Sequence, residues 1–350
     1  MSHTSILTQP EPSPGRRGAD ASGAVPAWRL SVAPMMDWTD RHYRYFARRL
    51  TRRSLLYTEM ITTGAIIHGD RDWLLGFDVD EHPLSLQIGG DDPAACAESV
   101  RIAGDYGYDE FDLNVGCPSD RVQEGFFGAC LMAKPPQVAR IVEAMKGATS
   151  RPVTVKHRIG IDGRESYEEM AEFVSTVAGA GADRFIVHAR IAILDGLNPK
   201  ENRSIPPLRY EDVYRLKEEF PELTIEINGH IGGVPQVAAQ LERVDGVMVG
   251  RSAYERPFWL REVDQAIYGE EASAPTRRQV IEEMIPYIEA VQRRDRHPRV
   301  VLRHMLGLFA DRPGAKIWKR ALSGKLDPHM NVGAFLQEIM RRLPGEVLDE

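Results

Sequence analysis

The stretch FDLNVGCPSDRVQEGFFGACLM (111–132) begins as an apolar strand and ends in polar residues. Asn114 closes the apolar run, Cys117 follows it, and a second cysteine, Cys130, comes after a glycine-containing loop. A short apolar run bounded by Gly and Pro is typical of a strand buried in a parallel sheet. The pattern therefore predicts a buried strand whose carboxyl end presents Asn114 and Cys117.

Eight short apolar or β-branched runs of this kind recur along the chain, with amphipathic segments between them that often begin at Asp or Pro and end at Gly. Strands that alternate with helices imply right-handed crossovers and a parallel sheet, and eight such strands close a barrel. We therefore predict an α/β fold, a (β/α)8 TIM barrel over residues 28–270. A doubly wound open sheet is the alternative, but the glycine fingerprint expected after its first strand is absent. The runs are LSVAPM at 30, LLYTEM at 55, LSLQIG at 84, EFDLNVG at 110, VTVKHRIG at 153, RFIVHAR at 184, LTIEING at 223 and GVMVGR at 246.

The two ends of the chain differ from this pattern. After residue 274 only helical periodicity is left, which predicts a small all-helical domain over 275–345. Residues 1–27 are rich in Ser, Pro, Gly, Ala and Arg, and we expect a disordered tail rather than a secretory signal.

Composition bears on membrane association, on the redox compartment and on metal binding. No run of eighteen apolar residues exists, so we expect no membrane span. The three cysteines, Cys96, Cys117 and Cys130, cannot all pair, and the C-x12-C spacing of the last two fits no common zinc arrangement. We therefore expect free thiols in a reducing, cytoplasmic compartment, no metal site, and no obligate protein partner.

Charge is distributed unevenly along the chain. The formal net charge is −7, but residues 291–342 hold twelve Lys or Arg against four Asp or Glu, which makes +8 there and −15 elsewhere. Such a split suggests that the C-terminal helices face a polyanion, although a solvated helical face explains it equally well. The polyanion interpretation assigns phosphate contacts to Arg303, Lys316, Lys319 and Arg320.

Polar residues cluster at the carboxyl ends of the predicted strands, where TIM barrels carry their chemistry. Any one of them is equally well explained as a hydrogen-bonded core residue. Their recurrence at one end of a barrel is harder to explain that way, because burying each without a partner would cost about 1–3 kcal/mol. In strand order they are Met35 to Asp37 after Pro34, Glu59, Gln87, Asn114 with Cys117, Lys156 with Arg158, His188 with Arg190, Asn228, and Gly250 with Arg251.

Glycines after the seventh and eighth strands indicate a phosphorylated ligand. NGHIGG (228–233) and GRSAYERP (250–257) lie where barrels bind phosphate with backbone N–H groups and a helix N-terminus. Many sugar phosphates would satisfy this feature alone. The ring of Gln87, Asn114, Lys156 and His188 also suits a flat heterocycle, and a Lys beside a flavin would stabilise the negative charge of its reduced form. Flavin mononucleotide (FMN) satisfies both observations.

These motifs together resemble the tRNA-dihydrouridine synthases. The resemblance covers roughly residues 29–325 and rests on LNVGCPSDRV, SVAPMMDWTD, LQIGG, VTVKHRIGID, HAR, PKENR, INGHI and GVMVGR. Similarity to the A type of that family rests on APMMDWTDRHYRYF, YTEMITTGAIIHGD, NPKENRSIPPL and RHMLGLFADRPGAKIWKR. It implies an FMN-bearing barrel followed by a helical tRNA-binding domain.

The resemblance also implies a role for each matching residue. Cys117 would be the proton donor, Asn114 would hold the uracil or the adjoining nucleotide, and Lys200, Arg203 and Arg303 would meet the RNA. Two positions depart from the family pattern, namely His230, where the family usually has Gly, and His157, where Thr is more common. The FMN contacts would be Pro34, Met35, Met36, Gln87, Lys156, His188, Asn228, Gly229, His230, Gly250 and Arg251.

The reaction that the resemblance implies is the reduction of the C5–C6 bond of a uridine in the tRNA D-loop, at positions 20 and 20a, with NADPH or NADH as reductant. Hydride would reach C6 from the flavin and a proton would reach C5 from Cys117, since a thiol keeps its proton at neutral pH. Attack of Cys117 on C6 is a competing role. Two rival functions are a flavin barrel acting on a free pyrimidine, similar to a dihydroorotate dehydrogenase, and an RNA-binding or chaperone protein with a vestigial flavin fold.

Overall fold

Short parallel strands form a closed ring at the centre of the molecule. The computed structural model describes residues 24–119, 125 and 127–350. Within them the strand order is β2-β1-β9-β8-β7-β6-β5-β4-β3, and β2 also pairs with β4, which closes the ring. The strands are β1 (Leu30–Val32), β2 (Leu55–Tyr57), β3 (Ile61–Thr62), β4 (Leu84–Gly89), β5 (Glu110–Val115), β6 (Val153–Arg158), β7 (Arg184–His188), β8 (Ile225–Asn228) and β9 (Gly246–Val249).

Each of the eight predicted runs contains one strand of this ring. The predicted barrel is therefore confirmed, and the doubly wound open sheet is wrong because its edges would not meet. The two-residue strand β3 was not predicted. It pairs with the end of β4, on the edge that β2 also uses, and two residues are too few to carry a pattern.

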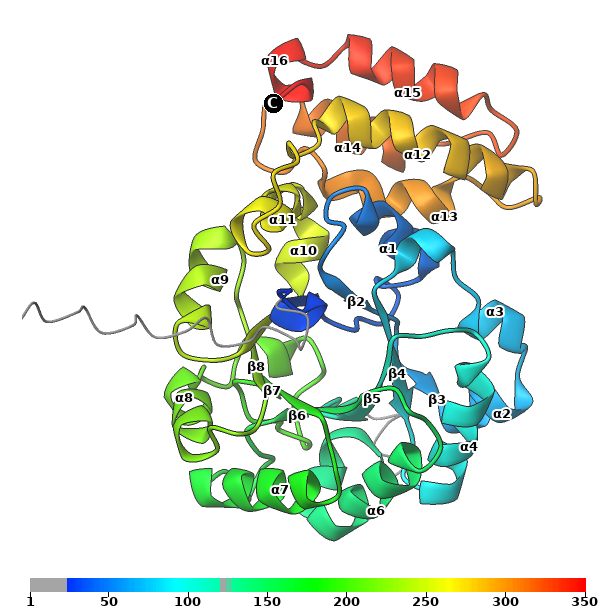
Figure 1. Ribbon diagram of the computed structural model, residues 1–350. Helices are drawn as coiled ribbons and strands as arrows, with labels where there is room; N and C mark the ends of the chain where they lie inside the picture. The colour runs from blue at the N-terminus through cyan, green and yellow to red at the C-terminus, as the bar shows by residue number, and fades with distance from the viewer. Residues whose placement is uncertain (1–23, 120–124, 126) are drawn as a thin grey trace, which may run out of the picture.

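Helices cover the outside of the ring and continue beyond it at one end (Figure 1). A short 3₁₀ helix, η1 (Ala27–Arg29), precedes β1; residues 1–23 of the predicted tail lie outside the described part of the chain. The helices of the barrel are α1 (Arg41–Arg48), α2 (Thr63–His68), α3 (Arg71–Leu75), α4 (Pro93–Gly104), α6 (Pro135–Lys146), α7 (Tyr167–Gly179), α8 (Tyr210–Glu219), α9 (Val234–Leu241), α10 (Arg251–Glu255) and α11 (Val263–Ala266), with 3₁₀ helices η2 (Val79–Glu81), η3 (Gly128–Ala133), η4 (Glu201–Arg203) and η5 (Pro257–Glu262).

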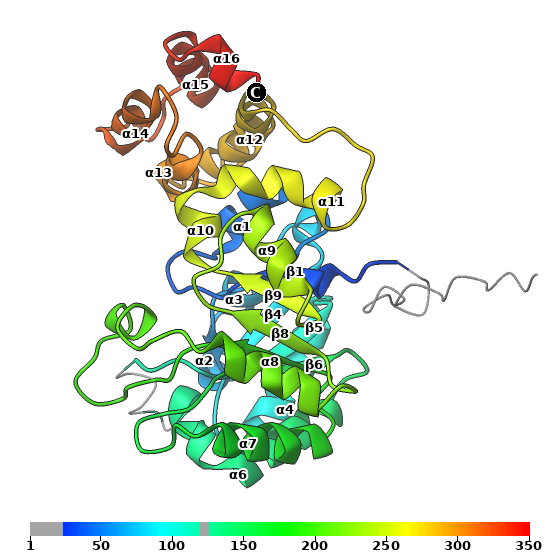
Figure 2. The same ribbon diagram turned by 90° about the vertical axis from the view of Figure 1, so that its left-hand side faces the viewer.

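The chain after residue 276 is helical throughout its regular elements. Thr276 caps α12 by accepting a hydrogen bond from the backbone N–H of Gln279, whose side chain accepts one in return, so the first of these helices has a defined start. Figure 2 shows α10 and α11 between the barrel and these helices. No helix in the described residues is long and apolar enough to cross a membrane. The elements are α12 (Arg277–Gln292), α13 (Arg299–Leu302), η6 (Arg303–Gly307), α14 (Ala315–Ser323), α15 (Val332–Arg341) and α16 (Gly345–Leu348).

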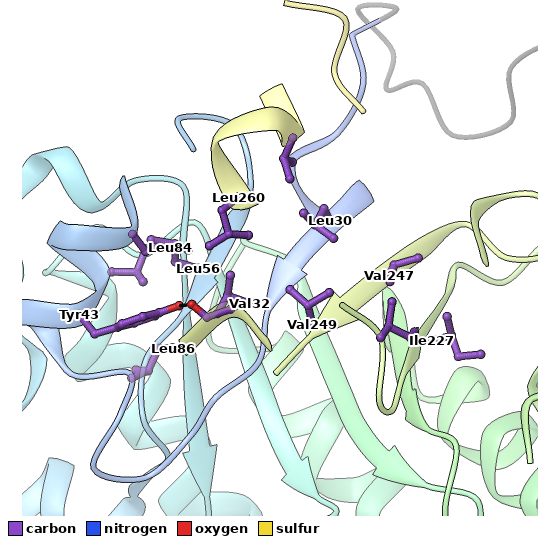
Figure 3. Packing of buried hydrophobic residues seen from close by; sticks show 14 of the residues in the cluster. Leu30, Val32, Tyr43, Leu56, Leu84, Leu86, Ile227, Val247, Val249 and Leu260 are labelled. Atoms are coloured by element: carbon purple, nitrogen blue, oxygen red, sulfur yellow. Dashed lines mark hydrogen bonds between the residues drawn. The ribbon is translucent and has the colours of Figure 1, made fainter. Parts of the chain in front are cut away.

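Alternation along the strands separates an apolar outer face from a polar interior. Outward residues such as Leu30, Val32 and Val249 are fully or almost fully buried and pack under helical side chains, among them Tyr43 and Leu260 (Figure 3). Each such side chain contributes about 1.5–3 kcal/mol through removal from water. The barrel is thus held together from outside, and its interior positions are free to carry polar groups.

An ion cluster fills the amino-terminal end of the barrel interior. Arg184 pairs with Glu110 at 2.8 Å and with Glu226 at 3.0 Å. Tyr57 donates to Glu110 at 2.9 Å, and the Ser31 hydroxyl bonds to Glu226. Burial raises the pKa of Glu226 to about 7, although the Arg184 charge opposes the rise. One guanidinium therefore keeps two buried carboxylates together.

Replacing Arg184 with Met is expected to lower the free energy of unfolding by about 3–5 kcal/mol, because it leaves two buried carboxylates without a counter-charge. The loss in free energy of unfolding should be larger at pH 8 than at pH 6. Arg184 opposes the rise in the pKa of Glu226, so its removal raises that pKa further, and the variant gains more stability than the wild type when the pH falls from 8 to 6.

Urea unfolding at the two pH values measures this effect. Arg215→Met is the matched control, because Arg215 makes an exposed ion pair with Glu219 on α8. Equal losses for the two variants would contradict a stabilising role for the Arg184 cluster.

Candidate active site

A cavity of about 1030 Å³ opens at the carboxyl ends of the barrel strands. It continues toward η5, η6 and the start of α12, so barrel and C-terminal helices both line it. The structure brings together at this cavity the predicted residues Pro34, Met35, Met36, Gln87, Asn114, Cys117, Lys156, His188, Arg203, Asn228, Gly229, His230, Gly250 and Arg251.

The loop after β1 forms one wall of the cavity. The carbonyl of Met35 accepts hydrogen bonds from the N–H groups of Trp38 (3.1 Å) and Thr39 (2.9 Å), and Asp37 takes a left-handed backbone (φ 63°). Met36 is left 56% exposed at the tip. Trp38, which was not predicted as a site residue, stacks on Tyr254 with ring centroids 4.3 Å apart. The stack fastens the loop to α10.

A chain of side-chain hydrogen bonds crosses the floor of the cavity. Asp112 accepts from Thr154 Oγ1 and from Gln87 Nε2, both at 2.8 Å. Gln87 Oε1 accepts from Asn114 Nδ2 at 2.8 Å. Burial raises the pKa of Asp112 to about 7. Asp112 was not predicted, because it lies two residues before Asn114 and not at the strand end; its parity with Asn114, which places both inside the barrel, was the available signal.

Lys156 and His188 stand beside this chain on β6 and β7. The Lys156 ammonium lies 3.4 Å from Oδ1 of Asn228, whose Nδ2 donates to the carbonyl of Met248. Burial lowers the pKa of Lys156 to about 8, opposed by the charge of Asp112. Burial, and then the charges of Arg158 and Lys156, hold the pKa of His188 well below its usual value. At neutral pH the site therefore holds a cationic Lys156 and a neutral His188.

Arg158 braces two loops from inside the site. Its Nε donates to the carbonyl of Gly116 at 2.9 Å, and its Nη1 donates to the carbonyls of Ile191 (2.9 Å) and Asn202 (3.1 Å). Asn202 is itself buried and donates to the carbonyls of Ile193 and Leu197. This one side chain thus ties the turn that carries Cys117 to the segment PKENR (199–203).

Cys117 sits at the head of the loop after β5, half-buried at the cavity wall. Its N–H donates to Asn114 Oδ1 at 3.0 Å, its carbonyl accepts from Ala129 N–H at 3.0 Å, and its Sγ lies 3.4 Å from Ser119 Oγ. Residues 120–124 and 126 of the loop lie outside the described part of the chain. Cys130 does not line this cavity; its thiol donates to the carbonyl of Phe127 at 3.0 Å, and burial raises its pKa.

The turns after β8 and β9 approach each other closely at the phosphate end predicted from the glycines. Gly229 (φ 135°) and Gly233 (φ 94°) have positive φ angles, which residues with a side chain rarely adopt. A Cβ on Gly232 would lie 2.6 Å from Cβ of Ser252 on α10. His230, at the position that departs from the family pattern, takes a left-handed backbone (φ 55°) and is exposed at the cavity.

Comparison with known proteins assigns the chain to a family. The dihydrouridine synthase (Dus) family model matches residues 31–343. The chain belongs to the dihydrouridine synthase family. A tRNA-dihydrouridine(20/20a) synthase from Synechocystis sp. is 60% identical over 84% of this chain and 88% of that protein. One from Escherichia coli O6:H1 is 53% identical over 87% and 92% of the two chains.

The fold also has a counterpart among solved structures. A 2-naphthoyl-CoA reductase in complex with 2-naphthoyl-CoA aligns with a TM-score of 0.50, at 11% identity, over 68% of this chain and 50% of that one. At that identity the likeness concerns the barrel alone. The family assignment rests on the sequence relatives, whose reaction is the reduction of uridine to dihydrouridine in tRNA.

Basic residues predicted to meet RNA in this Dus-family chain fall into three places. Arg203 lines the cavity and Lys200 is exposed on the same segment. Lys316 and Lys319 of α14 line a second hollow of about 530 Å³, together with Glu255 and Arg256, and Arg320 is exposed on the same helix.

Arg303 occupies a different environment from these side chains. Its Nη2 donates to Oδ2 of Asp40 at 2.6 Å, and the buried His304 lies 3.0 Å from the other oxygen of that carboxylate. Asp40 also caps α1 by accepting from the N–H groups of His42 and Tyr43. Arg303 therefore joins the C-terminal helices to the barrel, with its side chain 41% exposed.

Replacing Gly232 with Ala is expected to lower the melting temperature, because the new methyl group overlaps Ser252 and overpacking of this kind costs about 1–3 kcal/mol. Ser252→Gly removes the overlapping atom, so the double variant should melt above the Gly232→Ala protein. Thermal unfolding measures both.

Gly179→Ala is the control, because nothing lies within 4 Å of a Cβ built there. If the double variant melts no higher than Gly232→Ala, the overlap with Ser252 is not the cause of the lower melting temperature.

Proposed function

We propose that the chain reduces the C5–C6 double bond of uridine 20 and 20a in the tRNA D-loop, with FMN as its bound cofactor and NADPH or NADH as reductant. The observation that carries the proposal is the arrangement at the barrel mouth. A thiol, Cys117, shares one cavity with a half-buried Lys156, a neutral His188 and the glycine turns after β8 and β9. The relatives named tRNA-dihydrouridine(20/20a) synthase support the choice of substrate.

The residues at the mouth fit FMN. Gly232 has no side chain where one would strike Ser252, so backbone N–H groups at the starts of α9 and α10 can approach a phosphate. Lys156 brings a positive charge to a half-buried position near Asn228 and Asp112, which suits a ring that gains negative charge on reduction. Bound FMN supplies the hydride that reaches C6 of the uracil.

The chain's own residues supply the proton and hold the base. A proton must reach C5 from the face opposite the hydride, and Cys117 lies at the cavity wall on a turn that Asn114 and Arg158 fix. His188 is neutral and can donate a hydrogen bond without adding charge. Lys156 stays largely protonated at neutral pH and favours the negative charge that builds up on the ring before C5 is protonated.

A tRNA substrate accounts for features that a free pyrimidine does not need. A uracil in folded tRNA must be flipped out of its stack, at a cost of a few kcal/mol that contacts elsewhere offset. Lys316 and Lys319 line a hollow that shares Glu255 and Arg256 with the main cavity. Such a platform favours tRNA over a dihydroorotate-like substrate, and a cytoplasmic setting agrees with it.

Replacing Cys117 with Ala should leave FMN binding and its reduction by NADPH intact, while dihydrouridine formation falls by about 10²–10⁴-fold, the usual contribution of a positioned acid. The assay uses tRNA that lacks dihydrouridine, with product mapped to positions 20 and 20a by mass spectrometry. Cys130→Ala is the control and should keep full turnover, because Cys130 lies away from the cavity. Normal turnover by the Cys117→Ala protein would remove Cys117 from the reaction; failure of the wild type to form dihydrouridine at these positions would refute the proposed function.

Reversing charge at Lys316, Lys319 and Arg320 to Glu should weaken tRNA binding by at least about tenfold, because a side chain that no longer neutralises a phosphate no longer releases its counterion. The dependence of affinity on salt should also become shallower. Filter binding across a salt series measures both quantities. Arg101, Lys146 and Arg215, on α4, α6 and α8, form a matched triple whose reversal should change little. Equal effects from the two triples would show that α14 is not the RNA platform.

A further inference from the structure

A buried histidine links the C-terminal helices to the wall of the cavity. His304 of η6 is 1% exposed, and its Nε2 lies 3.0 Å from Oδ1 of Asp40. Its Nδ1 lies 3.1 Å from the hydroxyl oxygen of Tyr254 on α10. The Tyr254 ring stacks on Trp38 with an interplanar angle of 13°, and Trp38 lines the cavity. One imidazole therefore connects the residue that caps α1 to the cavity loop, residues 34–38.

The protonation of His304 determines which group donates at each contact. Burial lowers the pKa of His304, although its hydrogen bond to Asp40 opposes the fall, so the ring is neutral at neutral pH and carries one N–H. An ionised carboxylate only accepts, so this N–H lies on Nε2 and faces Asp40. Arg303 Nε also lies 3.1 Å from Nε2, and Arg303 is itself satisfied by Asp40 through its Nη2. Nδ1 is left as an acceptor, so the hydroxyl of Tyr254 donates to it.

The cavity loop is closed by its own hydrogen bonds and so follows Trp38. The carbonyl of Met35 accepts from the N–H groups of Trp38 and Thr39, and the N–H of Met35 donates to Thr39 Oγ1 at 2.9 Å. Met35, Met36 and Trp38 all line the cavity. A displacement of the Trp38 ring therefore moves both methionines relative to the rest of the cavity.

We propose that His304 is a positioning residue for the reaction, because its Nδ1 holds Tyr254 and Tyr254 holds the cavity loop through Trp38. The inference rests on the proposed function for the identity of the reaction. His304 and Tyr254 are not among the described residues that line the cavity, so both act through the loop. The C-terminal helices therefore support the geometry of the barrel site in addition to the proposed tRNA platform.

Two substitutions of His304 separate positioning from packing. In His304→Asn the side-chain oxygen falls near the place of Nδ1 and can accept from Tyr254, but the bond to Asp40 is lost. In His304→Gln the amide reaches the place of Nε2 and can donate to Asp40, but the bond to Tyr254 is lost. Both variants remove a ring that packs edge-on against Tyr43 and Tyr254, so a role in packing alone predicts similar effects for both.

A pair of tyrosine variants tests the hydroxyl group itself. Tyr254→Phe keeps the stack on Trp38 and removes the donor to His304. Tyr287→Phe is the matched control, because the Tyr287 hydroxyl also bonds an imidazole of the barrel, His42 Nδ1 at 2.8 Å. Tyr287 stacks on Tyr45, with ring centroids 3.8 Å apart, and is not among the described residues of the cavity.

The first measurement is hydrogen–deuterium exchange of the cavity loop in the protein with its cofactor bound. The N–H groups of Trp38 and Thr39 should exchange about tenfold faster in His304→Gln and in Tyr254→Phe, the effect of one lost buried hydrogen bond. The variant that combines both changes should exchange no faster than either alone. His304→Asn and Tyr287→Phe should keep the wild-type rate. Equal rates in His304→Gln and His304→Asn would overturn the positioning role.

The second measurement is dihydrouridine formation in tRNA. In His304→Gln and Tyr254→Phe, kcat should fall about tenfold with little change in KM for tRNA, because the displaced loop affects the reaction and not the RNA platform. His304→Asn and Tyr287→Phe should keep most of the wild-type kcat. Faster exchange with an unchanged kcat would show that the loop does not position the reaction. If the wild type forms no dihydrouridine, the proposed function fails, and the exchange rates still decide whether His304 holds the loop.

Discussion

Polar groups sealed inside a closed barrel must find partners inside it, and this constraint governs most of the molecule. The outer faces of the strands are almost entirely apolar and pack under helices, so stability comes from there. The interior then holds two polar layers. At the amino-terminal end Arg184 satisfies Glu110 and Glu226, and further along Asp112 satisfies Thr154 and Gln87. The carboxyl ends open to the cavity and leave hydrogen-bonding capacity for a ligand.

Much of the fold and of the site's location could be predicted from the sequence. β-Branched runs of four to eight residues mark strands because their side chains suit a pleated, buried surface. Eight of them imply closure, and closure gathers every carboxyl end at one mouth, so Gln87, Lys156, His188 and Asn228 could be placed together before any coordinates. Their roles toward FMN and tRNA stay predictions.

The features of the site that could not be predicted depend on contacts between segments far apart in the chain. The ion pair of Arg303 with Asp40 could not be predicted, because Asp40 lies 263 positions earlier and no local pattern reports such a pair. The RNA contact of Arg303 stays a prediction. Trp38 looks like an ordinary loop residue until Tyr254 stacks on it. Asp112 looks like one acidic residue in an apolar strand, and its neighbours Gln87 and Thr154 come from other strands.

The buried guanidinium of Arg158 has a consequence for how this protein can vary. It holds the carbonyls of Gly116, Ile191 and Asn202 at fixed distances from one another, and carbonyls belong to the backbone rather than to any side-chain type. Exposed residues of the two loops, such as Lys200 and Arg203, can therefore be exchanged without moving the turn that carries Cys117. The side chains exposed on these loops can vary while the position of Cys117 relative to the rest of the cavity stays the same.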